Sequence, residues 1–142
     1  MTRFVLDAPA VLALVESGTP VGEGHELLAP TLVRSQTLSL LHEAVHRGDL
    51  TEELARERLA ALQGLRLRLL GDAVLRKVAW ELATELGWTW TYDAEYVALT
   101  RLQADALVTL DPDLARDVRH LVRVAPLSEV TAPDRGPGGG SG

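Results

Sequence analysis

The sequence predicts an α/β fold of three layers, in which a short parallel sheet lies between two layers of helices. Short apolar segments alternate along the chain with longer amphipathic segments, and this alternation is typical of parallel strands joined by crossover helices. The chain has 142 residues, of which 46% are hydrophobic and 24% charged. This size and composition suit one folded domain with a substantial core and argue against general disorder.

The first residues of the chain predict two strands separated by a helix. An apolar run over residues 4–6 indicates a buried strand, and it ends at Asp7, which we expect at the carboxyl end of that strand. A helix over 10–15 follows, with Pro9 near its first turn. A loop rich in glycine and proline then leads to a very short strand over 26–29.

The clearest helix of the sequence opens at Pro30 and Thr31, runs to about Arg47 and stops at Gly48. Projected on a helical wheel, its apolar side chains cover one broad arc. Two polar residues, Gln36 and Glu43, lie with Arg47 in a stripe at the edge of that arc. The pattern predicts a helix that packs on the core and carries this polar stripe beside it.

The middle of the chain predicts a helix, a strand and a second helix. Thr51 is an expected N-cap for a helix over 51–63, since acidic residues fill the first turn. Leucine alternates with arginine over 65–69, which indicates a strand with one exposed face. Asp72 is then expected to cap a helix that runs to about residue 86.

The last elements predict a helix, a strand, a short helix and a final strand. Asp93 is the expected N-cap of a helix to about residue 102. An apolar strand over 106–110 ends at Asp111, and Pro112 stands where a short helix would begin. A last strand is expected over 122–125. With this element, alternating strands and helices fill the chain from its start to about residue 126.

We therefore divide the chain into a domain over 1–130 and a tail over 131–142. The tail is mostly proline, glycine and serine, and we expect it to be flexible because it cannot bury apolar surface. No apolar run approaches the ~18 residues that a membrane span needs, and an acidic residue follows too soon for a signal peptide. We expect a cytoplasmic protein with no membrane contact.

Charge and cysteine content exclude several classes of function. The net charge is −6, which argues against a protein held on DNA by general attraction. It does not argue against a metal-dependent nuclease, because such an enzyme needs an acidic pit whose field a bound cation inverts. Cysteine is absent, so disulfides, a thiolate nucleophile and cysteine-bound zinc are excluded.

Three aspartates are the candidates for chemistry. Asp7 and Asp111 follow predicted strands, and Asp93 opens a predicted helix. In an open parallel sheet, ligands bind outside the carboxyl ends of the strands. Carboxylates gathered there repel one another unless a hard cation such as Mg²⁺ or Mn²⁺ sits among them. The alternative is that these residues act only as helix caps, which aspartates at such positions often do.

Three blocks of the chain resemble the signature blocks of the PIN domain, and above all of the VapC-like toxins of type II toxin–antitoxin pairs: VLDAPAVLALVE at 5–16, LLAPTLVRSQTLSLL at 27–41 and YDAEYVALTRLQADALVTLDPDLA at 92–115. The third block is the most specific, because an aspartate opens a helix and a strand then ends in Thr-Leu-Asp. The resemblance implies a PIN-like three-layer fold and an endoribonuclease that hydrolyses RNA phosphodiester bonds with Mg²⁺ or Mn²⁺. It also implies a homodimer and inhibition by a small antitoxin protein.

Matched position by position, the resemblance assigns roles to five residues. Asp7, Asp93 and Asp111 match three of the family's four acidic residues, which are catalytic and hold the metal. Thr109 matches the small hydroxyl residue that hydrogen-bonds within the acidic site. Asp113 matches a position that is sometimes acidic and would assist there.

The chain departs from the family at the second acidic position, where a glutamate is expected and Gln36 stands. A glutamine keeps a carbonyl oxygen but has no charge and cannot act as a base. Either the site is impaired or inactive, or another acid compensates. We select Glu95 as that acid, although a favourable charge in the first turn of a helix explains it equally well. Glu43 would lie about 10 Å along the helix from Gln36, which we judge too far.

Two functions therefore stay open, a toxin ribonuclease and an impaired PIN-like domain that binds RNA or protein. Arginines are candidates for phosphate contacts with RNA, although each could equally be solvated or ion-paired: Arg34, Arg66, Arg68 and Arg101. Of these we select Arg34 and Arg101. The three tryptophans indicate core or interface positions rather than platforms for stacked bases, with one of the last two exposed: Trp80, Trp88 and Trp90.

Residues 42–46 spell the zinc-peptidase motif His-Glu-x-x-His. Both histidines, His42 and His46, lie opposite the apolar arc of their helix, so we expect them to face solvent. The helix ends two residues later, and no third histidine follows at the spacing of that enzyme class. We therefore expect a chance match formed by surface histidines.

Overall fold

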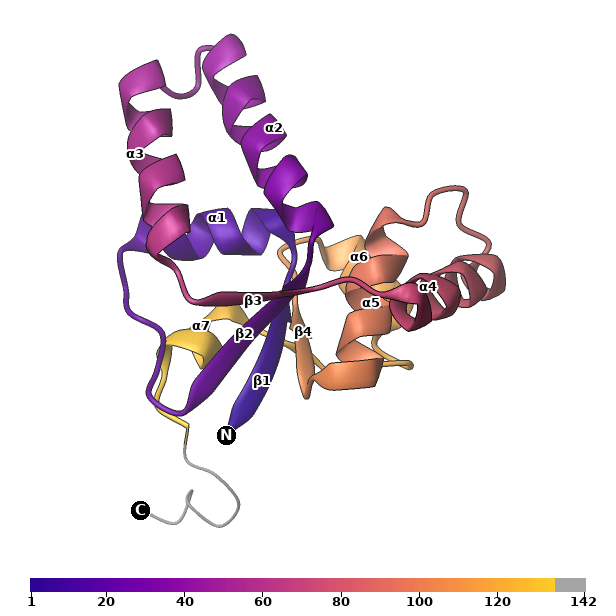
Figure 1. Cartoon of the computed structure of the whole chain (residues 1–142). Coiled ribbons are helices and arrows are strands. Elements are labelled where there is room, and N and C mark those ends of the chain that lie inside the picture. Colours follow the sequence, from indigo (N-terminus) through magenta and orange to yellow (C-terminus); the bar gives the residue numbers. More distant parts are fainter. Residues whose placement is uncertain (135–142) are drawn as a thin grey trace.

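The computed structural model describes residues 1–134, which form a parallel sheet flanked by helices, as the sequence predicts (Figure 1). Within these residues the sheet has five strands: β1 (Thr2–Leu6), β2 (His25–Pro30), β3 (Leu67–Leu70), β4 (Ala106–Val108) and β5 (Val124–Ala125). Their order is β3-β2-β1-β4-β5, and every neighbouring pair is parallel. Most of the tail predicted over 131–142 lies outside the described residues.

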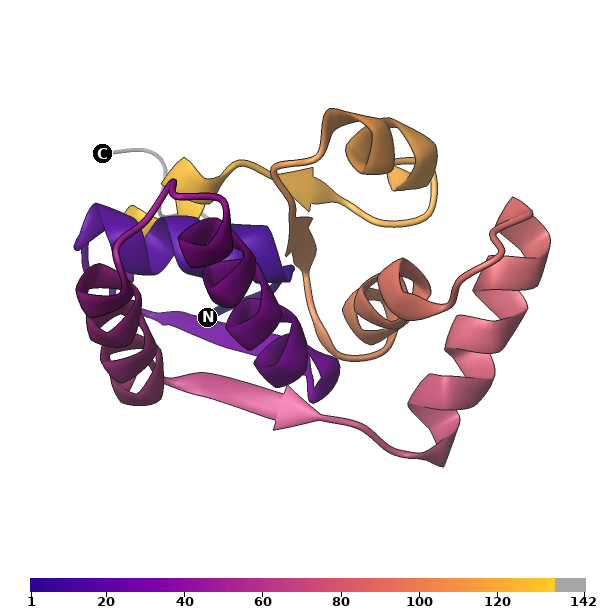
Figure 2. The ribbon, with the colours of Figure 1, turned by 90° about the horizontal axis from the view of Figure 1, so that it is seen from above.

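The helices connect successive strands, except the last, which follows β5: α1 (Ala8–Ser17), α2 (Leu32–His46), α3 (Glu52–Gly64), α4 (Ala73–Leu86), α5 (Tyr92–Gln103), α6 (Pro112–Val118) and α7 (Leu127–Thr131). α1 packs against α2 and α3, while α5 packs against β1, β2 and β4 and is covered by α4. Figures 1 and 2 show α1–α3 gathered on one side of the sheet and α4 and α5 on the other. The predicted three layers are therefore present.

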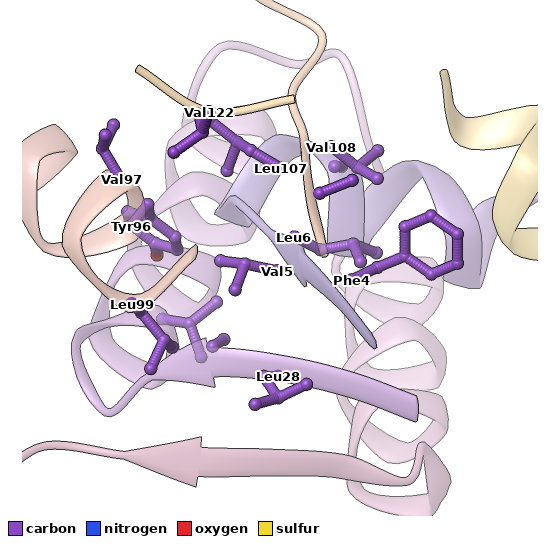
Figure 3. Close-up of a cluster of buried hydrophobic side chains, with 14 of the residues drawn as sticks. Phe4, Val5, Leu6, Leu28, Tyr96, Val97, Leu99, Leu107, Val108 and Val122 are labelled. Atoms are coloured by element: carbon purple, nitrogen blue, oxygen red, sulfur yellow. The ribbon is translucent and has the colours of Figure 1, made fainter. Parts of the chain in front are cut away.

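The core lies at the centre of the sheet, where β1 and β4 are covered on both faces. The side chains of Val5 and Leu107 are fully buried, as expected for central strands of a parallel sheet. Figure 3 shows Val5 and Leu28 in the apolar layer that the sheet forms with Leu99 and Tyr96 of α5. Burial of these side chains holds α5 against the sheet and so fixes the position of its first turn.

Side-chain caps start two of the helices where the sequence predicts them. The Thr51 hydroxyl accepts a hydrogen bond from the Leu54 N–H at 3.1 Å, and the Asp72 carboxylate accepts one from the Leu75 N–H at 2.8 Å. Each bond satisfies one of the backbone donors that the first turn of a helix leaves free. Both predicted N-caps are confirmed.

Several boundaries differ from the prediction, among them the end of β4, which stops at Val108 rather than at residue 110. Pro30 ends β2 instead of opening α2, and the next residue, Thr31, donates its N–H to the Leu70 carbonyl of β3 at 3.3 Å. Asp93 is not an N-cap: α5 begins one residue earlier, and Thr91 takes the cap position without a side-chain bond. The short helix α7 was not predicted at all, since its five residues carry too little periodicity to be recognised.

No helix within residues 1–134 is long and apolar enough to cross a membrane. The longest helix, α2, has 15 residues, and several of its side chains are polar. This agrees with the absence of a long apolar run in the sequence.

Replacing Leu107 by alanine is expected to lower the free energy of unfolding by about 2–5 kcal/mol, because it opens a cavity in the rigid centre of the sheet. Leu38→Ala on α2 is the matched control, since that leucine is 55% exposed and its loss should cost at most about 0.5 kcal/mol. Urea unfolding of both variants measures the difference. Equal effects would mean that the core is not where the structure places it.

Candidate functional site

The centre of the sheet is the place where its strand order reverses. From β1 the chain proceeds to β2 on one side, and from β4 it proceeds to β5 on the other side. Such a reversal leaves a crevice outside the carboxyl ends of the two central strands, where open parallel sheets bind their ligands. Asp7 follows β1 directly, and Thr109 and Asp111 follow β4.

Asp7 is buried and held by two hydrogen bonds. Only 7% of the residue is exposed. One carboxylate oxygen accepts the Ala10 N–H at 3.0 Å and caps α1, and the other accepts the Thr109 hydroxyl at 2.5 Å. The Thr109 oxygen in turn accepts the Asp111 N–H at 3.1 Å. The ends of β1 and β4 are thus tied together through Thr109.

Asp93 and Asp111 reach the same place from other segments. Asp93 lies in the first turn of α5, and Asp111 caps α6 by accepting the N–H groups of Asp113 and Leu114 at 2.9 and 3.3 Å. A cavity of about 320 Å³ is lined by both of these aspartates together with Asp7. Three carboxylates distant in the sequence therefore share one cavity, which we call the acidic cavity.

Other polar residues line the acidic cavity besides the three aspartates: Gln36, Ser39, Glu43 and Tyr96. The full set of lining residues includes no lysine, arginine or histidine. The negative charge of this cavity is therefore not balanced by a cationic side chain that lines it.

Burial and mutual repulsion act on the carboxylates. Burial raises the pKa of Asp7, the hydrogen bonds from Thr109 and Ala10 partly offset this, and the charges of Asp93 and Asp111 raise it further. Partial burial and the Asp111 carboxylate also raise the pKa of Asp93. The folded chain thus holds these carboxylates at an energetic cost, which is common at functional sites.

Gln36 accepts a hydrogen bond from the Tyr96 hydroxyl through its side-chain carbonyl oxygen, at 2.5 Å. Burial, together with the nearby charges of Asp7, Asp93 and Glu95, keeps the pKa of Tyr96 well above its usual range. Tyr96 consequently stays a hydrogen-bond donor at neutral pH. The hydrogen bond orients the amide group of Gln36, which contributes no charge to the acidic cavity.

The structure does not bring Glu95 or Asp113 into the acidic cavity. Burial raises the pKa of Glu95, and Arg76 of α4 lowers it. Asp113 is exposed and pairs with Arg116 at 3.2 Å. Glu43, set aside in the sequence as too distant, does line the cavity.

The position of Glu43 follows from the shape of the acidic cavity, which extends along α2. Gln36, Ser39, Leu40 and Glu43 all line it, and their spacing of three, four and seven residues keeps them on one helical face. That spacing was the signal in the sequence that could have identified Glu43 and Ser39. Tyr96 could have been identified in the same way, since it lies three residues after Asp93.

The arginines chosen for phosphate contacts lie elsewhere. Arg34 lines a separate cavity of about 510 Å³ formed with residues of α1, α3 and β3. Arg101 lies in the last turn of α5, beside the start of β1. It is therefore near the amino ends of the strands, whereas Asp7 lies at their carboxyl ends. His42 and His46 are both exposed on α2. Neither histidine lines the acidic cavity.

The donor set of the acidic cavity matches a hard divalent cation in chemistry. Its oxygens come from carboxylates, hydroxyls and an amide, and oxygen ligands of this kind are preferred by Mg²⁺ and Mn²⁺. Among residues 1–134, however, no group of three or more histidine, aspartate or glutamate side chains stands close enough to hold a metal ion. The residues fit an ion bound through one or two carboxylates and several waters, as is usual for Mg²⁺.

Comparisons with known proteins support the PIN-like fold. No family model and no curated protein matches the sequence. Among solved structures, PAE2754 from Pyrobaculum aerophilum is similar with a TM-score of 0.71 and 21% identity, covering 92% of this chain and 93% of that chain. VapBC2 from Rickettsia felis, bound to a DNA fragment from their promoter, is similar with a TM-score of 0.64 and 12% identity, covering 87% of this chain and 98% of that chain. At these identities the likeness shows the fold alone.

Asp7→Asn is expected to stabilise the fold at pH 7, because it removes a buried charge whose pKa is raised by burial and leaves an oxygen to cap α1. The pKa of Asp7 is raised in the folded chain, so its carboxyl group favours folding only at low pH, and that contribution is lost as the pH rises through the folded-state pKa. The gain of the variant should therefore be absent near pH ~3 and grow toward neutrality.

Urea unfolding of Asp7→Asn and the native chain between pH 3 and 7 measures this dependence. Asp113→Asn serves as a control, because Asp113 is exposed and lies outside the acidic cavity; it should show no such gain. A native chain more stable than Asp7→Asn at pH 7 would show that hydrogen bonding to the carboxylate outweighs its burial.

Proposed function

We propose that this chain is a metal-dependent endoribonuclease that hydrolyses RNA phosphodiester bonds, and that it is the toxin of a toxin–antitoxin pair. The observation that carries the proposal is the meeting of Asp7, Asp93 and Asp111 in one cavity at the reversal point of the sheet. The PIN-like fold and the likeness to VapBC2 support the same class of protein.

Asp7, Asp93 and Asp111 are the residues that would hold the ion, one or two of them directly and the others through water. Bound there, Mg²⁺ or Mn²⁺ would neutralise phosphate charge and make water a stronger nucleophile. Two hydrogen bonds hold the carboxylate of Asp7 in one orientation, so its position in the acidic cavity is fixed before an ion binds. Asp93 and Asp111 are more exposed, and their carboxylates are available to water and substrate.

Ser39 does not provide an alternative chemistry. Activation of a serine nucleophile needs a neighbouring base, most often a histidine, and no histidine lines the acidic cavity. The cavity thus favours attack by water over a covalent intermediate on the protein. On this proposal, Thr109 holds the carboxylate of Asp7 in place through the hydrogen bond that its hydroxyl group donates.

A second function is favoured by Gln36. Its uncharged amide stands where the related nucleases are expected to carry a glutamate, and Tyr96 holds it in place. A PIN-like domain with a weakened metal site would bind RNA or protein without cutting. Glu43 is the residue that could restore negative charge in the acidic cavity, since Glu95 is outside it.

The partners proposed for the chain are an RNA substrate, a small antitoxin protein and a second copy of the chain, all in the cytoplasm. The likeness of the fold to VapBC2 supports the antitoxin as a protein partner.

Single substitutions of Asp7, Asp93 or Asp111 by asparagine are expected to lower RNA cleavage at least about 100-fold, since each removes charge needed to hold the ion. The assay uses a mixed pool of single-stranded RNA with Mn²⁺, and a chelator should abolish cleavage by the native chain. Asp113→Asn is the control and should cut normally, because that residue lies outside the acidic cavity. Cleavage that survives both the chelator and Asp7→Asn would refute the proposal.

Gln36→Glu is expected to raise Mn²⁺-dependent cleavage about tenfold or more, because it adds a carboxylate to the metal site. The same charge should raise the thermal stabilisation that Mn²⁺ confers on the folded chain. If the native chain shows no cleavage and only Gln36→Glu cuts, the native chain belongs to the second, binding class. Unchanged cleavage in Gln36→Glu would mean that this position has no part in holding the metal.

A further inference from the structure

A second cavity adjoins the acidic one. It has a volume of about 470 Å³ and is lined by the loop between α4 and α5 together with Tyr92, and it also includes Gln36 and Asp93. The same two residues, Gln36 and Asp93, line the acidic cavity. A ligand that occupies the second cavity, which we call the aromatic cavity, therefore lies next to the carboxylates.

Two aromatic rings stack at the aromatic cavity and remain exposed. The rings of Trp90 and Tyr92 have centroids 6.0 Å apart and are inclined by only 12°. Trp90 is 68% exposed and Tyr92 is 49% exposed. The sequence indicates a core or interface position for Trp90 rather than a platform for a base, yet the stacked pair leaves much of its ring surface open to solvent.

The loop that carries these rings is anchored at both ends. Trp88 is half-buried and packs against the core, and its N–H donates to the Ala83 carbonyl at 2.8 Å. Tyr92 begins α5, whose next residues are buried against the sheet. The platform is thus held in position without a ligand, which reduces the entropy lost on binding.

We propose that the aromatic cavity binds one base of a single-stranded RNA, whose neighbouring phosphodiester then lies in the acidic cavity. Bases of any identity stack on exposed tryptophan and tyrosine rings, whereas the faces of a base inside a duplex are already covered. Gln36, Thr89 and Asp93 also line the aromatic cavity and offer hydrogen bonds to a base edge. The choice of RNA as the ligand rests on the function proposed above.

Charge supports stacking as the source of affinity. Neither cavity is lined by a lysine or an arginine, and the chain as a whole has a net charge of −6. Attraction to the phosphate backbone, which dominates most nucleic-acid binding, is therefore weak on this surface. Stacking of a base does not depend on positively charged side chains, and it supplies binding energy beside the reacting phosphodiester.

The test compares Trp90→Ala with Trp80→Ala. Both tryptophans are exposed to nearly the same extent, 68% and 69%, but Trp80 lies on α4 and lines neither the acidic nor the aromatic cavity. Fluorescence anisotropy measures the affinity for a labelled single-stranded hexaribonucleotide in Ca²⁺. Trp90→Ala should bind about 5- to 100-fold more weakly than the native chain, Trp90→Phe should fall between them, and Trp80→Ala should stay within about twofold.

A hexaribonucleotide whose bases are removed provides the second arm. The native chain should prefer the intact strand to the abasic one, and Trp90→Ala should lose most of that preference, because it lacks the stacking surface. A duplex of the same sequence should bind the native chain and Trp90→Ala with the same low affinity. Equal weakening for intact and abasic strands would overturn the inference, and so would an effect of Trp80→Ala as large as that of Trp90→Ala.

The outcomes separate this inference from the proposed nuclease. Binding that depends on Trp90 without any cleavage in Mn²⁺ refutes the nuclease and supports the base site. Cleavage by a native chain whose affinity and KM are unchanged by Trp90→Ala refutes the base site and leaves the nuclease. A loss of self-association in Trp90→Ala, with RNA affinity unchanged, would show that the rings contact a second copy of the chain and would also refute the base site.

Discussion

The buried carboxylate of Asp7 is the constraint on which the site depends. The last three residues of β1 are buried, and they deliver it to the point where the strand order of the sheet reverses. Its two hydrogen bonds link the start of α1 with the end of β4. Asp93 and Asp111 are placed around this group by elements that pack on the same central strands. The core and the acidic cavity are consequently parts of one arrangement.

The order and type of the elements were predictable because local signals agree with the fold. Short apolar runs mark the strands, and Thr51 and Asp72 are caps whose side chains bond where the sequence suggests. The meeting of Asp7 with Asp111 was also open to prediction, since parallel strands end at one edge of the sheet. Strand order was not predictable from these signals, because the right-handed rule for crossovers fixes the hand of each connection and leaves the order of the strands open.

Features that depend on packing could not be predicted in the same way. Glu43 was set aside in favour of Glu95 because of its distance from Gln36 along α2. The cavity, however, extends along α2, and its extent depends on how other segments pack against that helix. The exposure of Trp90 and its stacking on Tyr92 depend on a loop path that no periodic pattern records. The hydrogen bond between Tyr96 and Gln36 joins residues 60 positions apart and requires α5 to pack beside α2.

The outer strand β3 has a consequence for the behaviour of the chain in solution. It lies at the edge of the sheet and carries the exposed Arg68, whose guanidinium pairs with Glu26 of β2 at 3.3 Å. The other edge, β5, has only two residues. Charged or very short border strands are poor templates for strand addition by another molecule. Both edges of the sheet therefore resist fibril-like growth by the addition of further strands.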